Sequence, residues 1–247
     1  MKNYTTLLLD LDGTLLDIEV SFFLGPMVEA MHDCFRDILD MDRFRKGLFG
    51  GTEAIMVESR LMDSHKVHQD GETNLDGFNR VFSNLTGMDV PNIEKRFRQF
   101  YADVYPTLSS YGRPVVGASE FMTRAEREGY TLCLATNPIF PTSAVHERVR
   151  WSGLDSDAFC FIPGLETMRT CKPSVDYYLE LSSILDVSPS ECLMVGNDVQ
   201  QDLPALETGM GTFLVEGQVI DRGTSDLKPD ARGSLEDLGR LLGWENV

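Results

Sequence analysis

Short runs of consecutive apolar residues alternate with segments whose apolar residues recur every three or four positions. The first run lies within Tyr4–Leu15, where residues 7–9 are three successive leucines. Such a run is typical of a strand that is buried on both faces of a parallel sheet. Because helical patterns separate the runs, the sequence predicts an α/β fold built on a doubly wound parallel sheet. Further strands are predicted at 131–135, 158–162, 191–195 and 211–215.

A long helical segment interrupts this alternation directly after the first strand. From about Gly25 to Tyr105 the apolar residues follow helical periodicity, and Pro91 is well placed to open the last of four helices. The sequence RFRKGLFGG at 43–51 is interpreted as a basic, glycine-rich loop between the first two helices. We therefore predict one α/β domain made of residues 1–17 and 112–247, with a helical domain at 18–111 inserted into it.

The end of the chain shows weaker patterns. Residues 203–208 are predicted to be a helix, and 216–232 a surface loop before a final short helix. The five cysteines form no CxxC pair and are interpreted as reduced thiols, most of them in the core.

The chain is strongly acidic, with 22 Lys and Arg against 39 Asp and Glu and a net charge of −17 at pH 7. This charge repels the phosphate backbone of nucleic acids, so no nucleic-acid partner is expected. No run approaches the roughly 20 apolar residues of a membrane helix, and no signal-peptide pattern precedes the first strand. We expect a soluble, cytoplasmic monomer or homodimer without a membrane partner.

Polar side chains follow four segments of the predicted sheet domain. Because parallel strands all point the same way, these side chains are expected to meet at one edge of the sheet, where open α/β sheets bind their ligands. They are Asp10 and Asp12 after the first strand, Thr136 and Asn137 after the second, Lys172 before a helix, and Asn197, Asp198 and Asp202 after a later strand.

These residue types suit phosphoryl transfer. Carboxylate and amide oxygens at Asp10 and in the 197–202 group, with waters and a backbone carbonyl, match the octahedral ligand shell of Mg²⁺. Lys172 and the donors at 136–137 would then hold the phosphoryl oxygens. Asp10 is the candidate nucleophile, because a carboxylate attacks phosphorus without first losing a proton. Asp12 would protonate the leaving oxygen and later activate water.

Four motifs also carry a family resemblance: DLDGTL at 10–15, ATN at 135–137, KP at 172–173 and VGNDVQQD at 195–202. In order and spacing they resemble the motifs of the haloacid dehalogenase-like hydrolases. The resemblance implies a Rossmann-like core with an α-helical cap inserted at 18–111. It also implies Mg²⁺ bound by Asp10, by the backbone carbonyl of Asp12 and by one residue of the fourth motif.

The resemblance further implies roles for single residues. Asp10 would be the nucleophile and Asp12 the general acid and base, while Thr136 and Lys172 would bind phosphate. Dehalogenases proper lack the second aspartate of the first motif, so Asp12 indicates phosphate chemistry.

The fourth motif departs from the commoner Gly-Asp start, because Asn197 follows the glycine. The metal ligand is therefore either the amide oxygen of Asn197 or the carboxylate of Asp198. Asp202 would then orient Lys172 or a bound water.

The sequence thus predicts a Mg²⁺-dependent phosphatase that acts on a small phosphorylated metabolite through an aspartyl-phosphate. A phosphomutase is compatible with the same motifs. A non-catalytic binding module is the third hypothesis, and Asn197 is the one feature in its favour. The basic residues Arg43, Arg45 and Lys46 are either a solvated helix end or a cap loop that recognises an anionic substrate.

Overall fold

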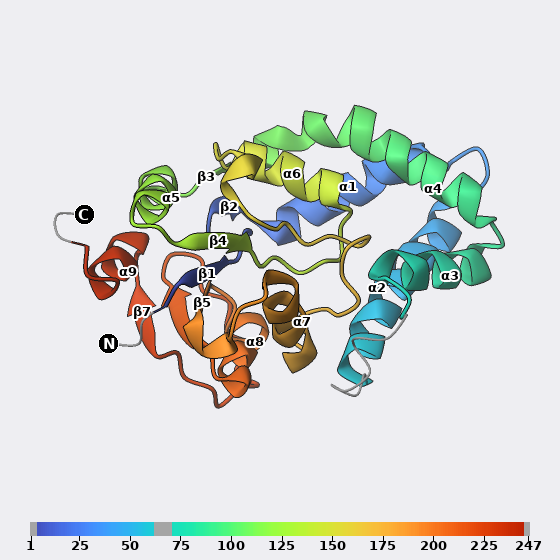
Figure 1. Ribbon diagram of the computed structural model, residues 1–247. Coiled ribbons are helices and arrows are strands. Elements are labelled where there is room, and N and C mark those ends of the chain that lie inside the picture. The colour runs from blue at the N-terminus through green and yellow to red at the C-terminus, as the bar shows by residue number, and fades with distance from the viewer. Residues whose placement is uncertain (1–3, 62–70, 245–247) are drawn as a thin grey trace.

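The computed structural model describes residues 4–61 and 71–244. Figure 1 shows a twisted sheet toward one end of the molecule and a group of helices toward the other. Five strands form the main sheet in the order β4-β1-β5-β6-β7, and every neighbouring pair is parallel. The predicted doubly wound α/β architecture is therefore confirmed. The strands are β1 (Thr6–Leu9), β4 (Thr131–Leu134), β5 (Cys192–Gly196), β6 (Gly211–Val215) and β7 (Ala231–Gly233).

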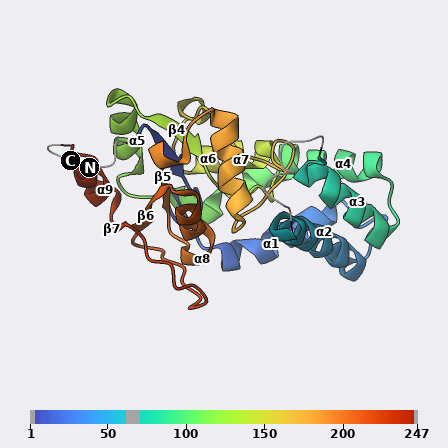
Figure 2. The same ribbon diagram turned by 60° about the horizontal axis from the view of Figure 1, so that its bottom comes forward.

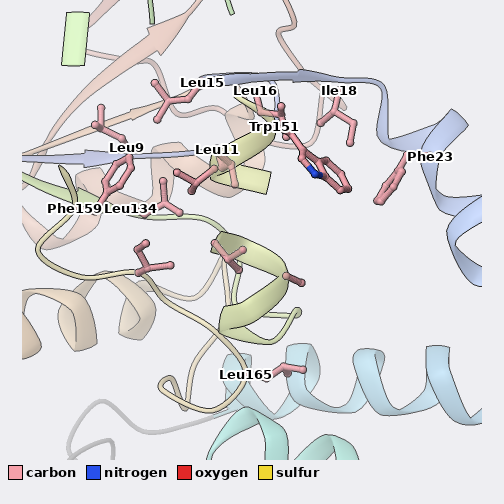
Figure 3. Close-up of a cluster of buried hydrophobic side chains, with 14 of the residues drawn as sticks. Leu9, Leu11, Leu15, Leu16, Ile18, Phe23, Leu134, Trp151, Phe159 and Leu165 are labelled. Atoms are coloured by element: carbon pink, nitrogen blue, oxygen red, sulfur yellow. The ribbon is translucent and has the colours of Figure 1, made fainter. Parts of the chain in front are cut away.

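Helices pack on both faces of this sheet, and successive residues of the central strand explain why. Leu7 and Leu9 join an apolar cluster with α5, α6 and α9, while Leu8 joins a second cluster with α7 and η5. All three leucines are fully buried, as expected of a strand without a solvent-facing side. Figure 3 shows Leu9 within the first cluster. The helical elements of this part are α5 (Ala118–Arg127), α6 (Thr142–Trp151), η3 (Ser156–Ala158), α7 (Val175–Leu185), η4 (Pro189–Glu191), α8 (Val199–Asp202), η5 (Leu203–Thr208) and α9 (Leu235–Leu241).

The helical segment leaves and returns to the sheet through a two-stranded antiparallel ribbon of β2 (Leu16–Ile18) and β3 (Gly112–Pro114). Figures 1 and 2 show the helices between these strands gathered at the end of the molecule opposite α9. The described residues of this segment form four α-helices, as the periodicity predicts, and the last continues through a π-helical turn and a 3-10 segment. They are α1 (Val20–Asp33), α2 (Met41–Leu61), α3 (Asn74–Thr86), α4 (Val90–Gln99), η1 (Phe100–Val104) and η2 (Tyr105–Tyr111). We call this helical segment the cap; the predicted domain boundaries themselves stay a prediction.

The cap contacts the sheet domain through the first turn of α3. The backbone N–H groups of Asn74 and Leu75 donate to the carbonyls of Met168 and Leu165, each over 2.8 Å. The side-chain amide of Asn74 also donates to the carbonyl of Thr170 over 3.3 Å. Two of the free N–H groups at the start of α3 are thus satisfied by the chain segment that leads to Lys172, and the N–H of Asp76 is satisfied by the Thr73 hydroxyl.

The predicted basic loop at 43–51 is wrong, because these residues lie inside α2. Its glycines serve close packing of α2 on α3 rather than a turn. A Cβ at Gly47 would lie 2.6 Å from Thr86 Cγ2, and one at Gly51 would lie 2.7 Å from Phe78 Cδ2. Local composition cannot distinguish a flexible glycine from one that only makes room for a neighbouring helix.

Two smaller predictions also need correction, and a third is confirmed. The segment 158–162 is not a strand, since it pairs with β4 only through a bridge at Phe161. The predicted helix at 203–208 is confirmed, as a 3-10 helix that continues α8. The predicted loop at 216–232 is partly wrong, because its last two residues belong to the edge strand β7, which has no apolar run. Two hydrogen bonds between Thr212 and Asp230 join the start of this strand to β6. The five cysteines are free thiols, as predicted, although Cys160 is exposed.

Candidate active site

The end of β1 lies between the ends of β4 and β5, which brings three of the motifs together. Leu9 is level with Leu134 on one side and with Val195 on the other. The N–H of Asp10 donates to the carbonyl of Val195 over 2.9 Å, and the N–H of Ala135 donates to Leu9 over 2.7 Å. The residues that follow these strands therefore start from one edge of the sheet, as predicted.

Lys172 lies between two carboxylates at this edge. Its Nζ donates to Asp10 Oδ1 over 3.0 Å and to Asp202 Oδ1 over 2.6 Å, and the lysine is only 1% exposed. Burial raises the pKa of Asp10 to about 7, while the charge of Lys172 opposes that shift. Burial alone would lower the pKa of Lys172, but the two carboxylates outweigh it and the pKa is raised. Lys172 is therefore a buried cation at neutral pH.

Asn197 packs against the turn that follows Asp10. Gly13 has a positive φ of 83°, and a Cβ there would lie 2.1 Å from Asn197 Nδ2, so the turn needs glycine on both grounds. The hydroxyl of Thr14 donates to Asn197 Oδ1 over 3.2 Å, and Asn197 Nδ2 donates to the carbonyl of Gln218 over 2.7 Å. The first and fourth motifs are thereby joined directly.

The carboxylate of Asp198 has other partners. Arg222 donates to both of its oxygens, over 2.8 and 2.9 Å, and the N–H groups of Gln200 and Gln201 donate to Oδ1. Asp198 is thus the N-cap of α8 and half of an ion pair. Asp202 instead accepts from Lys172 and, through Oδ2, from the N–H of Asp198 over 2.8 Å. Of the two roles open for Asp202, this geometry fits the orientation of Lys172.

Asp12 has a partner that the sequence analysis missed. Arg148 of α6, which is 2% exposed, donates through Nη1 to Asp12 Oδ2, and its guanidinium lies 4.4 Å from the centroid of the Phe140 ring. Among the described residues, Asp12 Oδ1 and the Nε and Nη2 of Arg148 are buried without a hydrogen-bond partner. Buried polar atoms of this kind call for water or a ligand group. An arginine on a helix carries no sequence signal that identifies it as the partner of a distant carboxylate.

The two residues predicted to donate to phosphate differ in their surroundings. Thr136 is buried, and its backbone carbonyl accepts from the hydroxyl of Tyr177 over 2.8 Å. The side chain of Asn137 donates to Gln201 Oε1 and accepts from the backbone N–H of Lys172, both over 3.2 Å. Asn137 therefore helps to hold Lys172 in place, and phosphate binding by either residue stays a prediction.

The segment after β6 also takes part, although a plain surface loop was predicted. The N–H of Ile220 donates to the carbonyl of Asn197, and the N–H of Val199 donates to Ile220, both over 2.9 Å. With Gln218 and Arg222, this segment covers the fourth motif. Nothing in its composition indicates the role, because the contacts join residues about 20 positions apart.

The basic residues of the cap lie far from this edge. Arg43, Arg45 and Lys46 are exposed on α2. The Arg43 guanidinium lies 3.1 Å from the position of a Cβ on Gly87, just beyond the end of α3, whose other end contacts the sheet domain. A helix of 13 residues spans about 20 Å. This placement agrees with a solvated helix and not with a loop over the active site.

Oxygen atoms available at the edge fit a hard cation. In the described ranges no three His, Cys, Asp or Glu side chains are arranged as metal ligands. The alternative is a mixed set of the Asp10 carboxylate, the backbone carbonyl of Asp12 and the Asn197 amide oxygen. An amide oxygen has two lone pairs, so the Thr14 hydroxyl leaves one free at Asn197. Such a set suits Mg²⁺, which keeps several waters beside few protein ligands.

Among residues 4–61 and 71–244, no helix is both long and apolar enough to cross a bilayer.

Similarity to known proteins was found in sequence and in structure. The chain is 26% identical over 151 residues to the chloroplastic protein SUPPRESSOR OF QUENCHING 1 of Arabidopsis thaliana, a match that covers 59% of this chain but 14% of that protein. Among solved structures, YfnB from Bacillus subtilis, described as bound to magnesium, has a TM-score of 0.57 at 20% identity over 98% of this chain and 100% of its own.

Phosphatases and dehalogenases both occur among the similar structures. A HAD phosphatase from Thermococcus onnurineus has a TM-score of 0.56 at 20% identity, over 98% of this chain and 100% of its own. The L-2-haloacid dehalogenase from Xanthobacter autotrophicus has a TM-score of 0.54 at 15% identity, over 97% and 98%. At such identities these structures support the fold alone. Residues 4–209 match the family described as haloacid dehalogenase-like hydrolase, and the chain belongs to that family.

Proposed function

We propose that this hydrolase is a Mg²⁺-dependent phosphatase that acts on a small phosphorylated metabolite through an aspartyl-phosphate. The observation that carries the proposal is the buried Lys172, held between Asp10 and Asp202 at the end of the central strand. A fixed cation beside a carboxylate nucleophile suits a dianionic phosphoryl group, since it offsets charge without reorganisation during the reaction.

Asp10 is the group that attacks. Its carboxylate forms a bond to phosphorus while the bond from phosphorus to the leaving oxygen breaks, which produces an aspartyl-phosphate and an alcohol. Asp12 gives a proton to that leaving oxygen and later takes one from the water that hydrolyses the aspartyl-phosphate. Lys172 keeps Asp10 oriented and offsets charge on the phosphoryl oxygens.

Mg²⁺ would be held by the Asp10 carboxylate, the Asp12 carbonyl and the amide oxygen of Asn197. When bound, the ion neutralises charge between the phosphoryl group and the carboxylates. Asn197 is preferred to Asp198 because Arg222 and the start of α8 already engage both oxygens of Asp198.

Asp12 favours phosphatase over dehalogenase chemistry. Cleavage of a carbon–halogen bond releases halide, which needs no proton, whereas an alkoxide leaving group does. The position of Asp12 two residues after the nucleophile, with one buried oxygen unpaired in the described structure, supports such a donor. Among the described residues, no contact favours a phosphomutase. Asn197, the one feature in favour of a binding module, has an amide oxygen that accepts only the Thr14 hydroxyl among the hydrogen bonds described and can still bind a metal ion.

One experiment separates these activities. The protein is assayed with Mg²⁺ on a panel of phosphorylated metabolites and on 2-chloropropionate, with release of phosphate and of chloride both measured. We expect phosphate release that EDTA abolishes and that Asp10→Asn removes, while the exposed-site control Asp33→Asn keeps it. Chloride release, transfer of phosphate within a sugar phosphate, or full activity of Asp10→Asn would each contradict the proposal.

A further inference from the structure

Arg148 reaches Asp12 from a helix whose end is packed against the cap. Trp151, three residues further along α6, stacks on Tyr105 of η2 with ring centroids 5.1 Å apart. Its ring also meets the edge of Phe23 of α1 at 6.0 Å, and Figure 3 shows these two rings side by side. Because close packing of large side chains leaves a helix little freedom to shift, the backbone that carries Arg148 is well fixed.

The guanidinium of Arg148 is held in turn by the ring of Phe140. The Cζ atom lies 4.4 Å from the ring centroid, a distance at which the negative face of an aromatic ring attracts a cation. Burial alone would lower the pKa of Arg148, but the charge of Asp12 opposes this effect and the pKa is raised. Arg148 is therefore a permanent cation whose side chain is fixed at both ends.

Arginine has no hydrogen-bond acceptor, and this property decides how Asp12 can carry a proton. Arg148 Nη1 donates to Asp12 Oδ2, so a proton on Oδ2 would face another N–H and break that contact. The other oxygen, Oδ1, has no hydrogen-bond partner among the described residues. A protonated Asp12 therefore carries its proton on Oδ1 while Oδ2 stays with Arg148.

Stability alone does not explain this buried pair. The loss of hydration offsets most of the attraction between two charges that leave water together. In the described structure the Nε and Nη2 of Arg148 also lack hydrogen-bond partners, and unpaired buried donors destabilise a fold. Apolar side chains would join α6 to the first motif more stably, so the chemistry of Asp12 is the better reason for the pair.

The two aspartates of the first motif are also served by different cations. Lys172 donates to Asp10, whereas Arg148 donates to Asp12. The side chain of Arg148 is 3% exposed and that of Asp12 is 23% exposed, so the arginine supports the carboxylate from the protein interior. Each carboxylate is thus oriented independently of the other.

We propose that Arg148 is a positioning residue that holds Asp12 by Oδ2 and directs Oδ1 to the leaving oxygen of the substrate. This inference rests on the proposed phosphatase function and deepens it. The proton on Oδ1 passes to the leaving oxygen as its bond to phosphorus breaks. Oδ1 then takes a proton from the water whose oxygen attacks phosphorus, while the bond from Asp10 to phosphorus breaks. Arg148 exchanges no proton and touches no reacting atom.

The test varies how much the leaving group needs a proton. It compares the aliphatic phosphate ester that is hydrolysed fastest in the panel above, whose alkoxide needs one, with 2,4-dinitrophenyl phosphate, whose phenolate leaves without one. We expect Arg148→Met to lower kcat/KM by about 100-fold for the aliphatic ester and by less than about threefold for the dinitrophenyl ester. A merely structural role would lower kcat/KM for both esters alike.

Arg150→Met is the matched control, because Arg150 lies on the same helix and its side chain is 72% exposed. This variant should change kcat/KM for either ester by less than about twofold. A loss in Arg150→Met that equals the loss in Arg148→Met would contradict the assignment.

A second comparison uses Asp12→Asn as the starting point. If Arg148 acts only through Asp12, adding Arg148→Met to Asp12→Asn should change kcat/KM for the aliphatic ester by less than about twofold. The double variant has no uncompensated charge at this position, so it should fold even where Arg148→Met alone does not. A further loss of about tenfold would overturn the proposal, since Arg148 would then act independently of Asp12.

Failure of this inference and failure of the phosphatase function give different results. If the wild type releases phosphate from both esters but Arg148→Met loses activity on both equally, the role of Arg148 is wrong and the phosphatase function stands. If the wild type releases phosphate from no ester of the panel and not from the dinitrophenyl ester, the phosphatase function is wrong and the role of Arg148 is refuted with it.

Discussion

Replacement of Lys172 with methionine tests the arrangement at the centre of the site. The side chain is 1% exposed and contacts the carboxylates of Asp10 and Asp202, whose side chains are 12 and 2% exposed. Methionine keeps much of the apolar stem but leaves two buried carboxylates without their cation. Removing one partner of a buried ion pair costs about 3–5 kcal/mol, a large part of the 5–15 kcal/mol that stabilises a typical domain.

The loss should depend on pH in a defined direction. Lys172 lowers the pKa of Asp10 against the effect of burial, so its removal raises that pKa further above about 7. In both proteins the folded state keeps a proton that the unfolded chain releases near pH 4, so the unfolding free energy of each falls as pH rises from about 4. The fall ends near pH 7 in the wild type and continues to higher pH in the variant, so the difference between them grows above about pH 7. The variant should therefore lose little stability at pH 4 and most at pH 8.

Urea unfolding of the metal-free protein at pH 4, 6 and 8 measures this loss. Lys95→Met, at an exposed lysine of α4, is the control and should change the unfolding free energy by less than about 0.5 kcal/mol. Addition of Asp202→Asn to Lys172→Met should recover part of the loss, because one buried charge disappears. A loss below about 1 kcal/mol at pH 8, or one that does not change with pH, would refute the reasoning.

Three further predictions follow from other contacts. Gly51→Ala should lower the free energy of unfolding in urea by about 1–3 kcal/mol, because the new Cβ would lie 2.7 Å from a buried ring of α3. Gly25→Ala is the control: a Cβ there meets nothing within 4 Å, so this variant should raise the free energy of unfolding by about 0.5–1 kcal/mol. A larger loss in Gly25→Ala than in Gly51→Ala would contradict the close packing of α2 on α3. Asn197→Leu should weaken Mg²⁺ binding by about tenfold or more in calorimetry, while Asp198→Asn keeps it within about threefold, and the reverse would make Asp198 the ligand. Metal-free Asp10→Asn should have the same melting temperature as the wild type at pH 4, and a melting temperature that exceeds the wild type's by more and more as the pH rises toward 7. The reason is that the wild-type protein loses stability with rising pH, because burial raises the pKa of the Asp10 carboxyl to about 7. A difference that does not change with pH would contradict that raised pKa.

Local patterns were sufficient for the sheet and for the placement of the motifs. Three successive leucines at 7–9 require burial on both faces, and that burial holds in the structure. Since parallel strands end at one edge, the position of Asp10 relative to residues 135 and 196 followed from strand assignment alone. The periodicity of the cap likewise predicted its helices.

Contacts between distant segments could not be predicted in this way. The glycines at 43–51 suggested a loop because their composition is that of a turn, but their role depends on the helix that packs against them. The partners of Asp12 and Asp198, which are Arg148 and Arg222, lie 136 and 24 positions away and belong to no motif. An arginine on a helix or in a loop has the same local signal wherever its guanidinium goes.

The sequence by itself determined the family, the parallel sheet and the edge at which Asp10, Lys172 and Asn197 meet, because each depends on short-range periodicity and on strand direction. Only the tertiary structure decided that Lys172 contacts the carboxylates of Asp10 and Asp202 while Arg222 contacts that of Asp198. It also decided where an apolar cavity lies beside the cap helices. Those outcomes depend on side-chain packing between segments far apart in the chain, where burial and charge compensation select one arrangement among many that the local sequence allows.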